Sequence, residues 1–165
     1  MSLTLTQKER ALLEDQKAHE ELCIKKYNNY ASQAQDPELK QMFQTFAKQE
    51  QQHLNTINQM LSGQVPNMQQ NQQQNQQQNQ QQGQQQNQQQ NQQNQQSGMV
   101  NAADVDLCTD MLMTEKYVSR TYDTAVFEFV DTNARQALNH IQKEEQQHGE
   151  GIFNYMKKNG MYQIQ

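Results

Sequence analysis

The 165-residue sequence has only two cysteines, Cys23 and Cys108, and they do not form a Cys-x-x-Cys pair. A disulfide framework and a thiolate zinc site are therefore both disfavoured, and we expect two buried free thiols. No stretch approaches the roughly 20 apolar residues of a membrane-spanning helix. The N-terminal residues MSLTLTQKER also lack the basic start and apolar run of a signal peptide. From these absences we expect a soluble chain that is not exported.

Basic residues are not in excess, and strand signals are missing. The formal net charge is −5, and acids and bases are interspersed without a basic stripe. Binding to nucleic acid or to an anionic membrane surface is therefore not expected, because both need clustered positive charge. No segment alternates apolar and polar residues with β-branched enrichment, so the pattern favours an all-α fold.

Apolar residues make up only 33% of the chain, partly because of one low-complexity tract. Residues 69–96 are all Gln or Asn except Gly83. Such a tract has nothing to bury, so we predict a disordered linker over 64–98. Either it is a tolerated expansion of a surface connection, or it forms Gln/Asn ladders that help an assembly cohere. The blocks on either side, 1–63 and 99–165, are each small for an independent core and are expected to pack together.

Capping signals divide each block into two helices. Thr6-Gln-Lys-Glu9 is a capping box that opens a first helix near residue 7. Asp36-Pro37-Glu38 combines an N-cap, a first-turn proline and an acid, and it opens the second. The other expected boundaries are an end at Ser62-Gly63, a third start at Asp104, a fourth start at Asp131 or Thr132, and an end at Asn159-Gly160.

The two blocks are copies of one another. A constant shift of 95 residues pairs KQEQQH at 48–53 with KEEQQH at 143–148, and it pairs Glu20 with Glu115. The chain is therefore a duplicated helical hairpin. Two hairpins that each have one apolar face can bury both faces by forming a four-helix bundle.

Four acids and two histidines fall on the apolar seams of the predicted helices. The seams advance in steps of three, four or seven residues, as in Leu39, Phe43 and Ile57 of the second helix. The six polar residues at seam positions are Glu20, Glu50, His53, Glu115, Glu145 and His148. All six are therefore expected to point into the core.

Buried acids on these seams require a compensating cation. An unpaired buried carboxylate costs several kcal/mol, and no Lys or Arg occupies the seams. One Glu from each of two helices with Glu-x-x-His from each of the other two is a ligand set for two metal ions. Oxygen ligands with one imidazole per ion suit iron or manganese. We therefore expect two iron or manganese ions, with a structural bundle that only retains the polar cluster as the alternative.

Four further residues lie near this pattern. Tyr27 and Tyr122 follow the single acids of the first and third helices by one heptad. Each of them either hydrogen-bonds a metal ligand or is only a core aromatic. His19 and His140 fall off the seams and are expected at the surface.

The six-residue pattern resembles the ferritin-like superfamily, particularly its rubrerythrin-type members. The resemblance implies a ferritin-like four-helix bundle connected up-down-down-up, with the Gln/Asn-rich segment crossing its length. The C-terminal block from Asp106 onward, above all its tail IFNYMKKNGMY, resembles the coat F domain of endospore-forming bacteria. This second resemblance implies a spore coat component made in the mother-cell cytoplasm. Its expected partners are other spore coat proteins or further copies of itself.

Two functions remain open from the sequence. The first is a spore coat protein whose metal ions stabilise the bundle or act on peroxide or oxygen. The alternative is a cytoplasmic dimetal oxidoreductase similar to a manganese catalase or a rubrerythrin. The sequence has no Cys-rich electron-transfer module of the kind rubrerythrins carry. Among enzymatic reactions this favours peroxide disproportionation, which needs no external electron donor.

Overall fold

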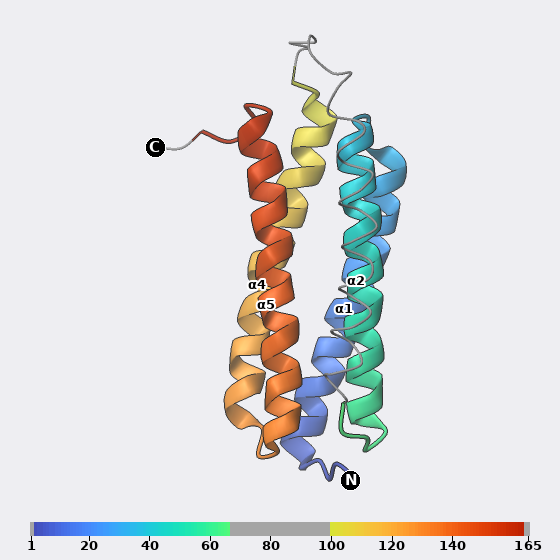
Figure 1. Ribbon diagram of the computed structural model, residues 1–165, viewed down its shortest axis with the longest axis vertical. Coiled ribbons are helices and arrows are strands. Elements are labelled where there is room, and N and C mark those ends of the chain that lie inside the picture. The colour runs from blue at the N-terminus through green and yellow to red at the C-terminus, as the bar shows by residue number, and fades with distance from the viewer. Residues whose placement is uncertain (1, 67–99, 164–165) are drawn as a thin grey trace, which may run out of the picture. The chain divides into compact units, whose positions relative to one another are not determined.

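The computed structural model describes residues 2–66 and 100–163, which form four α-helices and no strand. The helices together make one compact unit, shown in Figure 1. The predicted Gln/Asn-rich linker falls almost entirely outside the described residues. The helices are α1 (Gln7–Gln33), α2 (Pro37–Leu61), α4 (Ala102–Glu128) and α5 (Thr132–Lys158).

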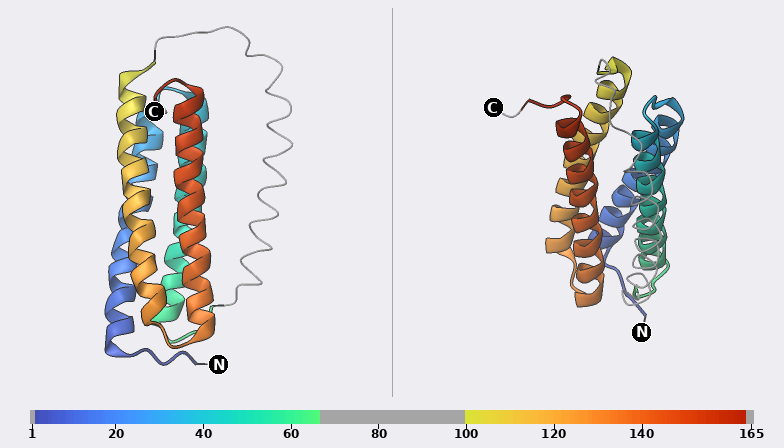
Figure 2. Two further views of the ribbon diagram at one scale, coloured as in Figure 1. Left: turned by 90° about the vertical axis from the view of Figure 1, so that its left-hand side faces the viewer. Right: turned by 45° about the horizontal axis from the view of Figure 1, so that its top comes forward.

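The bundle consists of two antiparallel hairpins, α1–α2 and α4–α5. The hairpins meet because α1 packs against α4 and α2 packs against α5, as the two views of Figure 2 also show. In Figure 1, α1 and α5 run upward whereas α2 and α4 run downward. Leu61 and Ala102 therefore lie at opposite ends of the bundle, and every packed pair is antiparallel.

Most helix boundaries follow the predicted capping residues. The capping box of Thr6 and Glu9 opens α1. Asp36 and Asp131 cap α2 and α5. Past the ends of α2 and α5, Gly63 (φ 82°) and Gly160 (φ 67°) adopt the left-handed conformation that glycine tolerates best.

The start of the third helix was predicted incorrectly. α4 begins at Ala102, and its N-cap is Asn101, whose side chain accepts the Ala103 N–H at 2.9 Å. Asp104, the predicted start, lies inside the first turn and is only 1% exposed. Because Asn101 caps α4, the Asp104 carboxylate can accept hydrogen bonds from another part of the chain.

Two buried acids hold the turns of the hairpins in a reciprocal arrangement. Asp104 accepts the backbone N–H groups of Gln35 and Asp36, at 2.9 and 3.0 Å, in the turn between α1 and α2. Glu9 accepts the Val130 N–H at 2.8 Å in the turn between α4 and α5. The repeat shift pairs Glu9 with Asp104 and Gln35 with Val130. Each hairpin therefore fixes the turn of the other.

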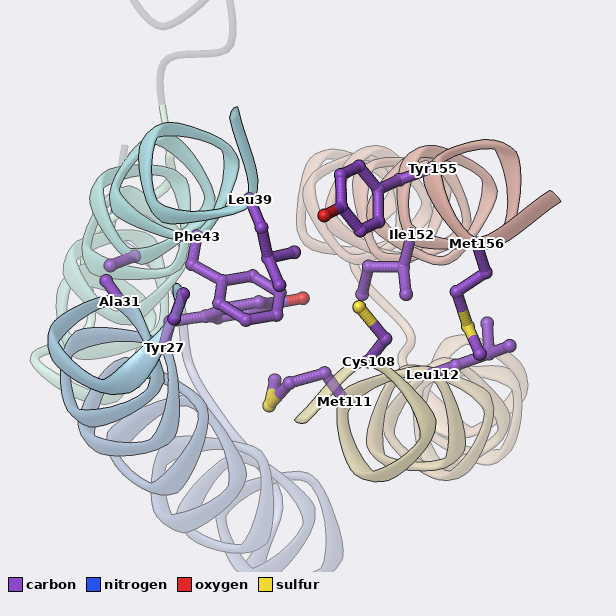
Figure 3. Close-up of a cluster of buried hydrophobic side chains, with 12 residues drawn as sticks. Tyr27, Ala31, Leu39, Phe43, Cys108, Met111, Leu112, Ile152, Tyr155 and Met156 are labelled. Carbon is purple, nitrogen blue, oxygen red and sulfur yellow. The ribbon is translucent and has the colours of Figure 1, made fainter. Parts of the chain in front are cut away.

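Apolar side chains from all four helices fill the core beside the polar seam residues. Figure 3 shows the part of this core near the α1–α2 turn, where aromatic rings of one hairpin face aliphatic and sulfur-containing side chains of the other. Its labelled members are Tyr27, Ala31, Leu39, Phe43, Cys108, Met111, Leu112, Ile152, Tyr155 and Met156. None of the helices described combines the length and apolar character that crossing a membrane requires.

Both cysteines are buried and free, as predicted. Burial, followed by the charge of Glu50, raises the pKa of Cys23. Burial and the charge of Asp104 raise the pKa of Cys108 to about 12. Both thiols therefore stay protonated at neutral pH and act as small core residues.

We expect Asp104→Ala to destabilise the bundle by about 1–3 kcal/mol, because two backbone N–H groups lose their acceptor. Urea unfolding followed by circular dichroism measures the change. Asp106→Ala is the matched control, since Asp106 is exposed two residues later in the same helix, and it should change stability by less than about 0.5 kcal/mol. Equal effects of the two variants would show that the reciprocal contacts do not hold the turns.

The placement of α2 and α4 also sets a minimum length for the chain that joins them. Helices of 25 and 27 residues are about 38–40 Å long. Five extended residues reach only about 17 Å. Deleting residues 64–98 would leave five residues, 62–63 and 99–101, between the two helices. This deletion should therefore force hairpins of two chains to pair, doubling the mass seen by light scattering. Halving the segment should leave the mass of the full-length protein unchanged. A five-residue variant of unchanged mass would contradict the crossing connection.

Candidate metal centre

The six polar seam residues lie together in the core, at most 2% exposed. Each helix contributes at least one of these residues, because the seams of all four helices face the centre of the bundle. α1 and α4 supply one acid each, and α2 and α5 supply a Glu-x-x-His pair each. The residues that the structure brings together are Glu20, Glu50, His53, Glu115, Glu145 and His148.

These residues form two overlapping groups of four. Within each group, one ligand atom from every residue lies within 4.8 Å of the others. The His53 group consists of Glu20, Glu50, His53 and Glu145, and the His148 group consists of Glu50, Glu115, Glu145 and His148. Both groups share Glu50 and Glu145, so these two carboxylates are placed to bridge a pair of ions. The repeat shift exchanges the two groups.

Both histidines turn the same ring nitrogen toward the carboxylates. His53 Nδ1 lies 2.9 Å from Glu145 Oε1 and 3.2 Å from Glu50 Oε2. His148 Nδ1 lies 2.9 Å from Glu50 Oε1 and 3.6 Å from Glu115 Oε1. The two rings stack with centroids 5.8 Å apart. Nδ1 is therefore the nitrogen of each histidine that is available to a metal ion.

The outer nitrogens of the histidines contact residues that the sequence analysis missed. His53 Nε2 lies 2.7 Å from Glu144 Oε2, and His148 Nε2 lies 2.9 Å from Gln49 Oε1. Acceptors in this position fix which nitrogen faces the metal. Gln49 and Glu144 are off the seams, and each contacts the histidine of the other hairpin. The only trace in the sequence is that they are the one difference between KQEQQH and KEEQQH.

Two tyrosines link the single acids across the hairpins. Tyr27 on α1 donates a hydrogen bond to Glu115 Oε1 on α4, and Tyr122 on α4 donates one to Glu20 Oε1 on α1. Burial and then the same carboxylates raise the pKa of both phenols well above the usual value. Both hydroxyls therefore stay protonated and remain donors. Of the two sequence interpretations, hydrogen bonding to the candidate ligands is the one found.

An aromatic ring covers one of the histidines. Phe46 stacks on His148 with ring centroids 4.4 Å apart. Gly151 leaves the room for this ring, because a Cβ there would lie 2.9 Å from Phe46 Cζ. A glycine inside a helix costs about 1 kcal/mol relative to alanine, so the contact explains its presence in α5.

The buried carboxyl groups have unequal affinities for protons. Burial and the charge of Glu50 raise the pKa of Glu20 to about 8. Burial, followed by Glu50 and Glu20, raises the pKa of Glu145 well above its usual range. Burial acts in the same direction on Glu50, but His148 and His53 outweigh it and hold its pKa well below the usual value. Protons and imidazolium charge thus balance the cluster when no metal is bound.

The histidines show the complementary effect. Burial lowers the pKa of both, but the surrounding carboxylates reverse this. The carboxylates of Glu144 and Glu145, which lie 2.7 and 2.9 Å from its ring nitrogens, contribute most to a pKa of His53 well above its usual value. Glu50 and then Glu115 raise the pKa of His148 to about 9. A metal ion that binds Nδ1 must therefore displace protons from the cluster.

Four buried carboxylate oxygens in the centre accept no well-aligned hydrogen bond from the described residues. They are Glu20 Oε2, Glu115 Oε2 and both oxygens of Glu145, although His53 Nδ1 approaches Glu145 Oε1 to 2.9 Å. Buried acceptors without partners are costly. These oxygens belong to residues of the two groups, whose ligand atoms lie close together. The residues present therefore fit a pair of hard cations. Three carboxylates and one imidazole per group are the donors that iron and manganese accept.

The two remaining histidines are less exposed than predicted. His19 is partly buried, with Nδ1 3.4 Å from Gln16 Oε1 and its ring edge-on to Tyr117. The His140 side chain is 25% exposed, and its Nε2 lies 3.5 Å from Glu144 Oε1. His19 thus contacts a side chain of α4, whereas His140 contacts a side chain of its own helix. Neither histidine belongs to the two groups.

Comparison with known families assigns part of the chain. Residues 103–165 match the Coat F domain. The match covers the α4–α5 hairpin except the first residue of α4. No curated protein and no solved structure matches the chain. The segment that matches the Coat F domain thus contains Glu115, Glu145 and His148, and the α1–α2 hairpin supplies the other members of both groups.

The proton affinities predict how the metal-free protein responds to pH. Glu20 and His148 have pKa values raised to about 8 and about 9, so the folded chain binds protons that the unfolded chain releases. Their contribution is complete at low pH and is lost as the pH rises through these values. The melting temperature of chelator-treated protein should therefore fall between pH 5 and 9.5. A Glu20→Gln/His148→Gln variant should show a flatter profile, and a rising wild-type profile would contradict the assignment.

Proposed function

We propose that the protein is a spore coat component whose ferritin-like bundle binds two iron or manganese ions. The coat assignment rests on the Coat F match over residues 103–165. We propose synthesis in the mother-cell cytoplasm, with other coat proteins or further copies of this chain as partners. The up-down-down-up order of the helices supports the ferritin-like comparison.

The metal assignment rests on one observation. Two groups of buried ligand atoms share Glu50 and Glu145, and four carboxylate oxygens within these groups accept no well-aligned hydrogen bond from the described residues. Each ion would have three carboxylates and one imidazole, and two of the carboxylates would be common to both ions. This is the donor arrangement of dinuclear carboxylate sites in four-helix bundles.

Bound ions would join the two hairpins. The α1–α2 hairpin lacks Glu145 for the His53 group, and the α4–α5 hairpin lacks Glu50 for the His148 group. Because the complete site exists only in the docked bundle, metal binding adds to the free energy of unfolding. A coat protein would gain resistance to unfolding from this, whether or not the centre is catalytic.

A dimetal enzyme acting on peroxide or oxygen is the second candidate. Glu50 and Glu145 are placed to hold two ions side by side, which two-metal reactions require. Iron or manganese would supply the change of oxidation state, while Tyr27 and Tyr122 would keep Glu115 and Glu20 oriented. Oxygen release from hydrogen peroxide by metal-loaded protein tests this candidate. Antibody detection in coat extracts and in mother-cell cytosol separates the two locations.

The metal content of defined variants tests the centre. Metal-free protein reconstituted with Fe²⁺ without oxygen, or with Mn²⁺, should retain two ions per chain by elemental analysis. Glu50→Ala should lose both ions because both groups share Glu50, whereas Glu115→Ala should retain one. His19→Ala is the control and should retain two.

The same samples test the contribution of metal to stability. Iron or manganese should raise the melting temperature of the wild-type protein and have little effect on Glu50→Ala, because only the docked bundle binds. A metal-free protein that is fully stable and unchanged by either ion would rule out the proposed centre.

A further inference from the structure

The two halves of the candidate centre differ in the residue that faces the outer nitrogen of each histidine. The repeat shift conserves all six candidate ligands, but it pairs Gln49 with Glu144. Glu144 Oε2 lies 2.7 Å from His53 Nε2, whereas Gln49 Oε1 lies 2.9 Å from His148 Nε2. The outer nitrogen of one histidine therefore faces a carboxylate, and that of the other faces a neutral amide.

This difference changes how strongly each histidine binds a metal ion. When Nδ1 binds the ion, Nε2 is protonated, and its N–H donates a hydrogen bond to the outer acceptor. A carboxylate accepts a stronger hydrogen bond than an amide, and it makes the imidazole a better electron donor. It also adds a negative charge near the cation. Water weakens this effect little, because Glu144 is only 8% exposed.

The neighbours of Glu144 leave this contact in place. His140 Nε2 lies 3.5 Å from Glu144 Oε1, the oxygen that does not face His53. The side-chain amide of Gln49 is neutral, and Gln49 is only partly buried. The difference in charge at the outer histidine nitrogens thus comes from a single carboxylate in place of an amide.

We propose that the two ion positions are inequivalent, with the His53 group filling first and the His148 group second. This inference rests on the proposed metal centre. Outer carboxylate partners of histidine ligands change metal affinity by about 10–100-fold, and we expect a ratio of this size between the two positions. At a limiting metal supply, the protein then holds one ion per chain, bound in the His53 group.

Stepwise addition of Zn²⁺ to metal-free, ¹⁵N-histidine-labelled protein tests the order of filling. Zn²⁺ is diamagnetic, and the chain has only four histidines, so each ring can be followed by NMR. The His53 Nδ1 signal should move during the first equivalent and the His148 Nδ1 signal during the second. Calorimetry on the unlabelled protein should show two steps with affinities about 10–100-fold apart.

Two variants assign the order to Gln49 and Glu144. Glu144→Gln should bring the two affinities together. The double variant Gln49→Glu/Glu144→Gln keeps the net charge and should reverse the order, so that His148 responds first. Glu150→Gln removes an exposed acid from the same helix and should leave the wild-type order intact. Circular dichroism checks that each variant folds.

The possible results separate this inference from the proposed function. If Zn²⁺ moves both signals together, or moves His148 first in the wild type, the inequivalence is wrong although the centre exists. An unchanged order in the folded double variant also refutes the role of Glu144. If neither histidine signal moves and no Fe²⁺ or Mn²⁺ is retained, the metal centre itself is wrong.

Discussion

The burial of four carboxylates within one small bundle is the constraint on which the rest of this structure depends. Carboxylates of this kind require positive charge nearby, and the seams provide only His53 and His148. In the metal-free chain, protons on Glu20 and Glu145 and charge on the histidines reduce the repulsion. Metal ions would replace these protons, and they would also bind the oxygens that accept no well-aligned hydrogen bond from the described residues. Proton binding and metal binding therefore compete for one set of atoms.

Duplication explains how so many polar groups can be buried with matching partners. Several contacts between the hairpins occur twice, once from each copy. Tyr27 to Glu115 repeats as Tyr122 to Glu20. The turn contacts of Glu9 and Asp104 repeat in the same way. The same side-chain contacts therefore join the two hairpins twice. Glu50 and Glu145, one from each copy, belong to both groups of candidate ligands.

Much of the fold could be predicted because its signals are local or periodic. The capping residues Thr6, Asp36 and Asp131 mark three helix starts, and the seam spacing identifies the six buried residues of the candidate centre. The start of α4 was misplaced because Asp104 resembles an N-cap, whereas Asn101 takes that role. Spacing along one helix could not reveal that Asp104 binds a turn in the other hairpin.

The partners of the histidines were missed for a related reason. Gln49 and Glu144 neighbour the seams in sequence but reach across to the opposite hairpin. Which residue lies beside a given histidine depends on the relative rotation and height of two helices, and periodicity does not fix these. Nearly all of the Gln/Asn-rich linker lies outside the described residues, so its disorder remains a prediction.

The boundary of the Coat F match has a consequence for other chains built from this unit. The matched segment is one hairpin, and its apolar seam and two carboxylates are covered here by the hairpin that precedes it. A polypeptide that consisted of this hairpin alone would therefore expose a hydrophobic face and an incomplete ligand set. It would have to recruit a second hairpin from another molecule. In this chain the complementary hairpin is encoded in the same gene product, so the bundle is complete without a second subunit.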